Sequence, residues 1–206
     1  MTVSCSTNVD PVRILSFDPG STNMGWAVSE YMIPTGDFLV VNYGIFKASK
    51  IAKKRKDEVL DFGQRLISLS VINEEVEKLL NSYQPHYVVT EDTFFNPGTP
   101  QAYISLLLCI HTVEQTLYRA FLNGKLKNHT AKKLYKIAPS TIKMIISGKG
   151  SNFKQQVIDS IVENEQITFK SVAVDESGNP TVSLIEHEAD AIAGGFTFAK
   201  TNLIIL

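Results

Sequence analysis

The 206-residue sequence has few cysteines, no long apolar run and little net charge. Its two cysteines, Cys5 and Cys109, form neither a CxxC motif nor a Cys/His spacing that binds zinc. We therefore expect a reducing intracellular compartment, and a chain of this length buries a sufficient core without disulfides or structural zinc. The longest apolar stretch, around ISLLLCI, is too short to cross a bilayer, and the first dozen residues do not have the pattern expected of a signal peptide. The sequence thus predicts a cytoplasmic protein with no membrane partner.

The formal net charge of −1 conceals two strongly basic segments. Residues 47–56, KASKIAKKRK, hold six of the 20 Lys and Arg residues, and residues 119–154 hold nine more. Neither segment contains an Asp or a Glu. Such segregation creates local positive fields that attract polyanions, although a pair of solvated loops can carry the same composition. The charge distribution therefore favours a nucleic-acid ligand.

Hydrophobic periodicity and turn residues predict the order of the secondary-structure elements. The expected elements are strands over 13–18, 24–30 and 37–47, a helix over 57–82, a strand over 86–92, a helix over 99–124, a strand over 133–139, helices over 140–147 and 153–164, strands within 166–185, and a closing helix over 186–202. Three antiparallel strands followed by βαβ units give an α/β fold. We expect a mixed five-stranded sheet flanked by helices on both faces, with the strand order of ribonuclease H-like folds. Residues 1–12 would form a flexible tail and 13–206 a single domain.

Four titratable residues lie where this topology brings chain ends together. Asp18 ends the first strand, Glu91 ends the fourth, and His187 and Asp190 lie one turn apart on the closing helix. If strands one and four are parallel neighbours, both acids lie at the same edge of the sheet. Taken alone, Asp18 could be a turn residue, part of a nucleotide-binding loop or a metal ligand.

Clustered carboxylates repel one another unless a cation neutralises them, and Mg²⁺ or Mn²⁺ accept such ligands. Two ions can clamp the attacking and leaving oxygens during phosphodiester hydrolysis. The acid set therefore predicts a pair of Mg²⁺ ions, with Mn²⁺ as a substitute. His187 would either bind metal or orient the attacking water.

Four segments resemble those of RuvC-type Holliday-junction resolvases. They are SFDPGSTNMGWAV, VVTEDTF, IAPSTIKMIISGKGSNFKQQVIDSIV and EHEADAIAGGFTFA. The resemblance runs from about Arg13 to Lys200, and its GKG segment is the most specific part. It implies a Mg²⁺-dependent endodeoxyribonuclease that acts as a homodimer on four-way junctions and on other branched DNA, including forks and flaps. Its catalytic and metal-binding set would be Asp18, Glu91, His187 and Asp190.

The resemblance and the basic segments also indicate DNA-binding residues. The predicted set is one aromatic residue and seven cations: Phe94, Lys143, Lys149, Lys154, Lys136, Lys53, Lys54 and Arg55. Phe94 matches an aromatic that stacks on bases near the crossover, and its alternative role is packing against the core. Lys143 and Lys154 match residues that contact phosphates at the site, whereas Lys136 and Lys149 would make general backbone contacts.

Departures from the family pattern suggest a viral or phage-like member, which would act in the host cytoplasm. They are extra residues at 31–36, 47–56 and 174–180. The helix over 99–124 is apolar nearly all round, which fits either a dimer face or a central buried helix. Its apolar positions include Leu106, Leu107, Leu108, Ile110, Val113 and Leu117.

Two other classes of function compete with a nuclease. An actin-like or sugar-kinase-like ATPase would use the DPG turn as a phosphate loop, but that fold needs two such domains. A catalytically silent junction-binding module is the other alternative, and the complete acid set argues against it.

Overall fold

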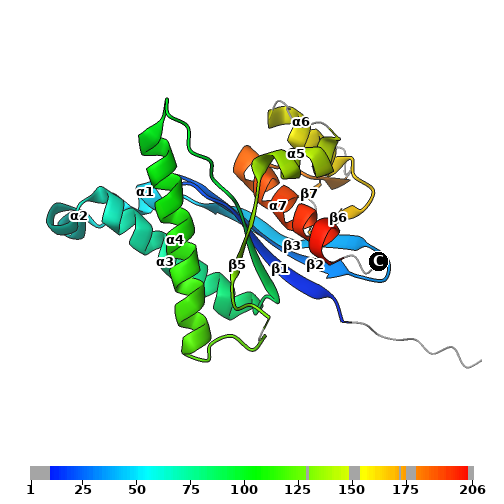
Figure 1. The fold of residues 1–206 in the computed structure, drawn as a ribbon, viewed down its shortest axis with the longest axis horizontal. Coiled ribbons are helices and arrows are strands. Elements are labelled where there is room, and N and C mark those ends of the chain that lie inside the picture. The colour runs from blue at the N-terminus through cyan, green and yellow to red at the C-terminus, as the bar shows by residue number, and fades with distance from the viewer. Residues whose placement is uncertain (1–9, 129, 149–153, 172, 175–179, 204–206) are drawn as a thin grey trace, which may run out of the picture.

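The computed structural model describes residues 10–128, 130–148, 154–171, 173–174 and 180–203. Within these ranges a mixed six-stranded sheet forms the centre of the molecule (Figure 1). Its strands are β1 (Val12–Asp18), β2 (Met24–Met32), β3 (Asp37–Phe46), β4 (Tyr87–Glu91), β5 (Leu134–Ile137) and β6 (Ile167–Phe169), in the spatial order β5-β4-β1-β2-β3-β6. A separate two-stranded ribbon pairs β7 (Ala173–Val174) with β8 (Pro180–Thr181).

The pairing of the strands confirms the predicted α/β topology. β1, β2 and β3 form an antiparallel meander, while β4 runs parallel to β1 and β5 runs parallel to β4. The sheet has six strands rather than the expected five, because β6 adds in parallel to the free edge of β3. β1 begins at Val12, so the end of the predicted tail belongs to the sheet. Residues 1–9 of that tail lie outside the described residues.

Helices cover both faces of the sheet, as expected (Figure 1). Those in the described residues are α1 (Ala48–Ala52), α2 (Lys56–Phe62), α3 (Gln64–Tyr83), α4 (Pro100–Leu122), α5 (Pro139–Ser147), α6 (Lys154–Val162) and α7 (Glu186–Asn202). Successive strand residues point to opposite faces. Leu15 and Phe17 of β1 therefore pack with α3 and α4, and Ile14 packs with α7.

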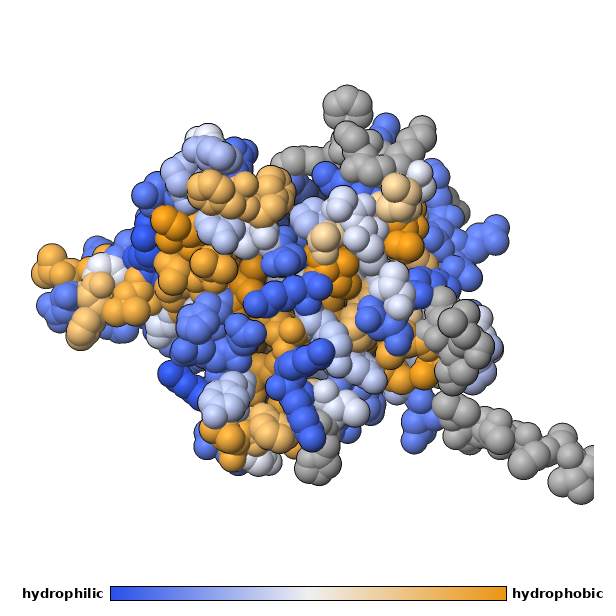
Figure 2. Space-filling view, viewed as in Figure 1, coloured by the Kyte–Doolittle hydropathy of each residue, from blue (hydrophilic) through white to orange (hydrophobic). Residues whose placement is uncertain are grey.

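The prediction of one helix over 57–82 is wrong. The chain breaks at Gly63, whose φ of +84° lies in a region that favours glycine. No residue of α2 is buried, so packing does not hold α2 in line with α3. Leu60 is 85% exposed and Phe62 is 63% exposed, and α2 projects from the body of the molecule as an apolar tip (Figure 2). The first basic segment, for which a solvated loop was one alternative, contains the short helix α1.

α4 is an amphipathic surface helix, which excludes the central buried role for it. One stripe, with Cys109, Ile110 and Val113, is buried against the sheet and α3. On the outer side Ile104 and Leu107 are exposed. None of the helices in the described residues is long and apolar enough to cross a membrane.

α7 lies unusually close to the sheet because its inner face is made of small residues. A Cβ added at Gly195 would meet Oγ of Ser16 in β1 at 2.8 Å. Ala191 and Ala193 are fully buried in the same interface. This close packing sets the first turn of α7 against the ends of β1 and β2.

Candidate active site

Asp18 and Glu91 end two adjacent parallel strands. The register pairs Phe17 of β1 with Thr90 of β4, so the following residues, Asp18 and Glu91, leave the sheet at the same edge. Both strands are buried up to their acidic ends, and the Asp18 side chain is only 13% exposed. The sheet therefore holds the two carboxylates side by side, as the sequence predicts.

The first turn of α7 brings His187 to Asp18. Nδ1 of His187 lies 2.6 Å from Oδ2 of Asp18, across 169 residues of sequence. Gly25, the cross-strand partner of Asp18 in β2, makes this approach possible. A Cβ at Gly25 would lie 1.9 Å from the carbonyl oxygen of His187, so any other residue would force the helix start away.

Burial and mutual repulsion raise the pKa of two carboxyl groups in this cluster. The pKa of Glu91 rises to about 8, first because burial removes water and then because Asp18 and Asp190 repel its charge. The pKa of Asp190 rises to about 7, through burial and through the charges of Asp18 and Glu186. Lys143 opposes both shifts. Glu91 and Asp190 therefore lie close enough to Asp18 for its charge to raise the pKa of both.

His187 is shifted toward its charged form. Its pKa rises chiefly because it shares a hydrogen bond with Asp18, and burial only partly offsets that effect. The imidazolium then donates from Nδ1 to the carboxylate and keeps Nε2–H available on its other side. The hydrogen bond also fixes the orientation of the ring.

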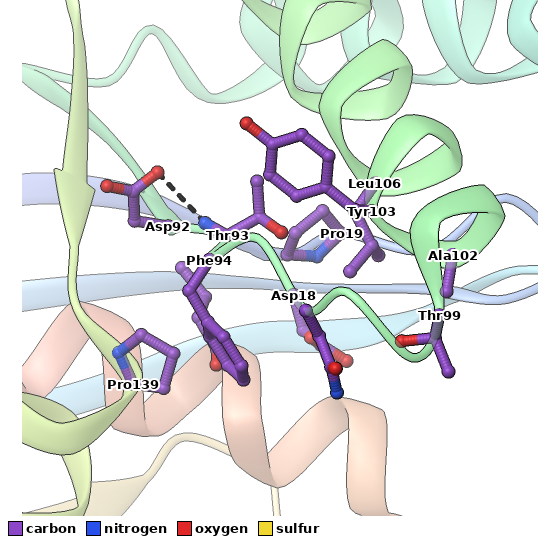
Figure 3. A pocket seen from close by; sticks show the side chains of 12 residues that line it. Asp18, Pro19, Asp92, Thr93, Phe94, Thr99, Ala102, Tyr103, Leu106 and Pro139 are labelled. Carbon is purple, nitrogen blue, oxygen red and sulfur yellow. Dashed lines mark hydrogen bonds between the residues drawn. The ribbon is translucent and has the colours of Figure 1, made fainter.

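Two adjoining clefts open beside the acids. The first has a volume of about 180 Å³ and is lined by Asp18, Glu91, Phe94 and Tyr103, among others. Figure 3 shows it between the start of α4, which contributes Thr99, Ala102, Tyr103 and Leu106, and Pro139 at the start of α5. The second is lined by Glu91, Lys143, Glu186 and Asp190. Glu91 and Pro139 border both, so the two clefts adjoin at the acids.

The donor chemistry of the cluster suits a hard divalent cation. Carboxylate oxygens and an imidazole are ligands that Mg²⁺ and Mn²⁺ accept. However, among the residues that the structure describes, no three His, Cys, Asp or Glu side chains are grouped closely enough to hold one ion. The structure therefore brings the four predicted residues to one edge of the sheet, but their side chains are not arranged closely enough to coordinate one ion.

The predicted DNA-binding residues fall into different environments. Phe94 is 69% exposed on the loop after β4, which argues against a core-packing role. Lys143 lines the second cleft. Lys136, on β5, is exposed and pairs with Glu114 at 3.7 Å. Lys149 lies outside the described residues, as does the side chain of Lys154 at the start of α6.

The first basic segment follows β3, whose last residue, Phe46, pairs with Met24 at the same end of the sheet as Asp18, and its helix α1 packs against α3. Lys53 and Lys54 are exposed between α1 and α2. Arg55 instead forms a bidentate ion pair with Glu74 of α3, with contacts of 2.8 and 2.5 Å. That pair anchors the base of α2, so Arg55 has a structural function that the basic composition did not indicate.

Sequence reasoning missed three residues at this site. Gly25 admits the start of α7, Tyr103 lines the first cleft, and Glu186 lines the second. The sequence carries a signal for Gly25, because a glycine inside a strand often marks the close approach of another backbone. Glu186 directly precedes His187 at the helix start.

Comparisons with known proteins agree with this architecture. No family model matches the chain. It is 24% identical over 191 residues to the crossover junction endodeoxyribonuclease RuvC of Fusobacterium nucleatum, covering 93% of this chain and 87% of that protein. It is 26% identical over 191 residues to the protein of the same name from Caldanaerobacter subterraneus, covering 93% and 94%. Thermus thermophilus RuvC, solved with a Holliday junction substrate, aligns with a TM-score of 0.64, 19% identity and coverage of 91% and 93%.

The strand order and the acids at the ends of β1 and β4 define a ribonuclease H-like fold. The similarity to curated RuvC proteins extends along nearly the whole chain. The chain is therefore similar in sequence to RuvC crossover junction endodeoxyribonucleases and shares the fold of Thermus thermophilus RuvC.

Proposed function

We propose that this chain is a divalent-metal-dependent endonuclease that resolves Holliday junctions. The observation that carries the proposal is the convergence of Asp18, Glu91, His187 and Asp190 from β1, β4 and α7 at one sheet edge. Two Mg²⁺ ions held by the carboxylates of Asp18, Glu91 and Asp190, or Mn²⁺ in their place, would supply positive charge at the scissile phosphodiester. Binding of cations by Glu91 and Asp190 would also relieve the repulsion that raises their pKa values.

His187 and Lys143 would act on the phosphate and the attacking water. Asp18 holds the His187 ring through Nδ1, which leaves Nε2–H directed away from the carboxylate to orient the water or a phosphate oxygen. Lys143 lies beside Glu91 and Asp190 in the second cleft. Its ammonium group would bind a phosphate oxygen of the strand as a point charge.

Selectivity for branched DNA would come from the exposed ring of Phe94. A base at a junction crossover is less constrained by stacking than one inside a duplex, and an aromatic side chain offers it a replacement partner. Phe94 lines the same cleft as Asp18, so a stacked base would place its phosphate near the acids. Forks and flaps also present unstacked bases, and we expect slower cutting of these substrates.

The outer surface of α4 is the proposed homodimer face. Ile104 and Leu107 are exposed there, close to the end of α4 that borders the first cleft. A two-fold dimer through this surface would pair two sites and cut opposite strands of a four-way junction. Leu107→Asp would halve the molar mass in solution if the surface is the interface. Unchanged mass would place the interface elsewhere.

A cleavage assay on a panel of DNA substrates tests the function. Four-way junctions, Y-forks and linear duplexes of equal concentration are incubated with Mg²⁺, with Mn²⁺ or with a chelator. We expect symmetric nicks in the junction only when a divalent ion is present. Asp18→Asn and Glu91→Gln should abolish cutting and retain junction binding. Robust cutting by either variant would overturn the assignment, and binding without cutting by the native chain would favour the silent module.

A further inference from the structure

Five cations gather at the end of the sheet opposite the acids. This distal basic patch consists of Arg119, Lys125, Lys127, Lys132 and Lys133, all of which are exposed. Arg119 lies in the last turn of α4, and the others lie between α4 and β5. β4 and β5 are parallel and end together near Glu91, so their first residues lie at the far end of the sheet. The patch is therefore separate from the clefts beside the acids.

The patch has more positive charge than its surroundings neutralise. Residues 119–136 contain six Lys and Arg residues and no Asp or Glu. Glu77 pairs with Lys125, and Glu114 pairs with Lys136. In the part of the chain that the structure describes, Arg119, Lys127, Lys132 and Lys133 have no carboxylate within ion-pair distance. A surplus of this kind attracts a polyanion.

Two neighbouring lysines of the patch flank the open edge of the sheet. Nζ of Lys132 lies 5.8 Å from the ring centre of Phe121, which belongs to α4. Nζ of Lys133 lies 4.5 Å from the ring centre of Tyr135, which in turn contacts Phe198 of α7. β5 is the edge strand, and hydrophilic side chains lie over its position in Figure 2. The aromatic rings thus hold the two ammonium groups on either side of a surface that no strand covers.

The spacing between the patch and the acids matches a short stretch of duplex. Lys133 lies four residues before Ile137, the register partner of Glu91, which is roughly 13 Å along a strand. The backbone N–H of Lys127 donates to the side chain of Gln84, which precedes the start of β4, so the patch extends beyond that end of the sheet. At about 3.4 Å per base pair, roughly 13 Å corresponds to about four base pairs, and the rest of the patch lies farther from the acids. Lys136 lies between the two ends.

We propose that the distal basic patch binds the sugar-phosphate backbone of a duplex arm, several base pairs from the cut. The proposal rests on the proposed nuclease function and extends it to the arm of the substrate. β5 is next to β4, which ends in Glu91, so its edge is a short route along the protein surface away from the site. Lysine contacts to phosphates release counterions, so such binding weakens steeply with salt.

The test compares three triple variants of the full-length protein. Lys127→Gln, Lys132→Gln and Lys133→Gln together remove the charge, and the three corresponding Lys→Arg changes keep it. Lys78→Gln, Lys170→Gln and Lys200→Gln remove the same charge from surface positions outside both basic segments. Affinity for a four-way junction with 15-base-pair arms is measured in chelator over a range of salt concentrations, and thermal denaturation checks folding.

We expect the Gln variant of the patch to lower the slope of log affinity against log salt by about 2 to 3. Its affinity at 0.1 M salt should fall about tenfold or more, while the Arg variant and the remote Gln variant stay close to the native protein. Single-turnover cutting at saturating protein should be unchanged, because the patch does not touch the scissile phosphate.

Native affinity and salt slope in a folded Gln variant would overturn the proposal. Self-association of that variant with unchanged affinity for DNA would also overturn the proposal. The lysines would then serve only to prevent the edge strand β5 from pairing with another chain. Failure of the native protein itself to cut junctions would contradict the proposed nuclease function, so the two failures are distinguishable.

Discussion

The carbonyl oxygen of His187 lies so close to Gly25 that a Cβ there would be 1.9 Å away. Gly25 is the cross-strand partner of Asp18, and Asp18 is the hydrogen-bond partner of His187. The three residues are therefore coupled by position, since the glycine admits the helix that brings the histidine to the carboxylate. The absence of one side chain in β2 controls the geometry of the site.

Gly25→Ala should move the start of α7 and separate His187 from Asp18. We expect junction cutting to fall at least a hundredfold, with helical content by circular dichroism close to native. Gly63→Ala is the matched control, because it strains a positive φ far from the acids and has open space for its Cβ. That control should lose roughly 1 kcal/mol of stability and retain cutting. Equal activity of Gly25→Ala and the native protein would contradict the coupling.

Glu91 should make the protein less stable as pH rises. An unfolded Glu has a pKa of about 4.3, and the folded pKa of Glu91 is about 8. Between these values the folded state binds more protons than the unfolded state, so the free energy of unfolding falls with increasing pH. Thermal denaturation in chelator should show Tm decreasing from pH 5 to pH 8. Glu91→Gln should make that decrease shallower without removing it, because the pKa of Asp190 is raised as well, whereas Glu165→Gln on the exposed surface should leave it as it is.

Divalent cations should stabilise the folded protein, because binding to the native state alone raises the free energy of unfolding. Mg²⁺ and Mn²⁺ should raise Tm more at pH 8 than at pH 6, since the raised pKa values of Glu91 and Asp190 make protons compete at the lower pH. Asp18→Asn should remove most of the increase, and Asp159→Asn on α6 should not. An equal Tm shift in Asp18→Asn would exclude that carboxylate as a ligand.

Phe94→Ala should weaken cutting of junctions without destabilising the fold. Stacking of one base is worth about 1–3 kcal/mol, which corresponds to a loss of about 5-fold to 150-fold. Phe94→Trp should keep most of the activity. The matched control is Phe95→Ala, which removes the neighbouring exposed ring and should leave cutting close to that of the native protein. Phe95 differs from Phe94 in that it contacts Tyr103 in an edge-on pair with ring centres 5.4 Å apart. A fluorescent base analogue at the crossover should report unstacking with the native protein and not with Phe94→Ala.

Local patterns predicted the elements that hold the acids. Alternating apolar residues before Asp18 and Glu91 predicted two strands, and their parallel pairing, which the expected strand order assumed, is observed. The closing helix lies at 186–202, as its small and apolar residues indicated. These features are local, or follow from general rules of chain connection, so one sequence was enough to predict them.

Features that depend on tertiary contact were not predictable in the same way. The periodicity over 57–82 continues through Gly63, but the chain turns there at a positive φ, and none of the residues of α2 is fully buried. The basic residues of 119–154 form one continuous segment in the sequence, but the direction of the chain reverses within that segment, between α4 and β5. Lys132 and Lys133 therefore lie at the start of β5, and Lys143 lies near Glu91, at its other end. Charge composition carries no information about such a reversal.

The hydrogen bond between Asp18 and His187 joins residues 169 positions apart. A ribosome adds about 5–20 residues per second, so His187 emerges roughly ten to thirty seconds after Asp18. The β1–β3 meander can form in that interval, whereas the centre is completed only when α7 docks. A nascent or prematurely terminated chain that folds its sheet thus lacks two of the four groups that would cut DNA. The order of synthesis itself would delay DNA cutting until α7 has emerged and docked.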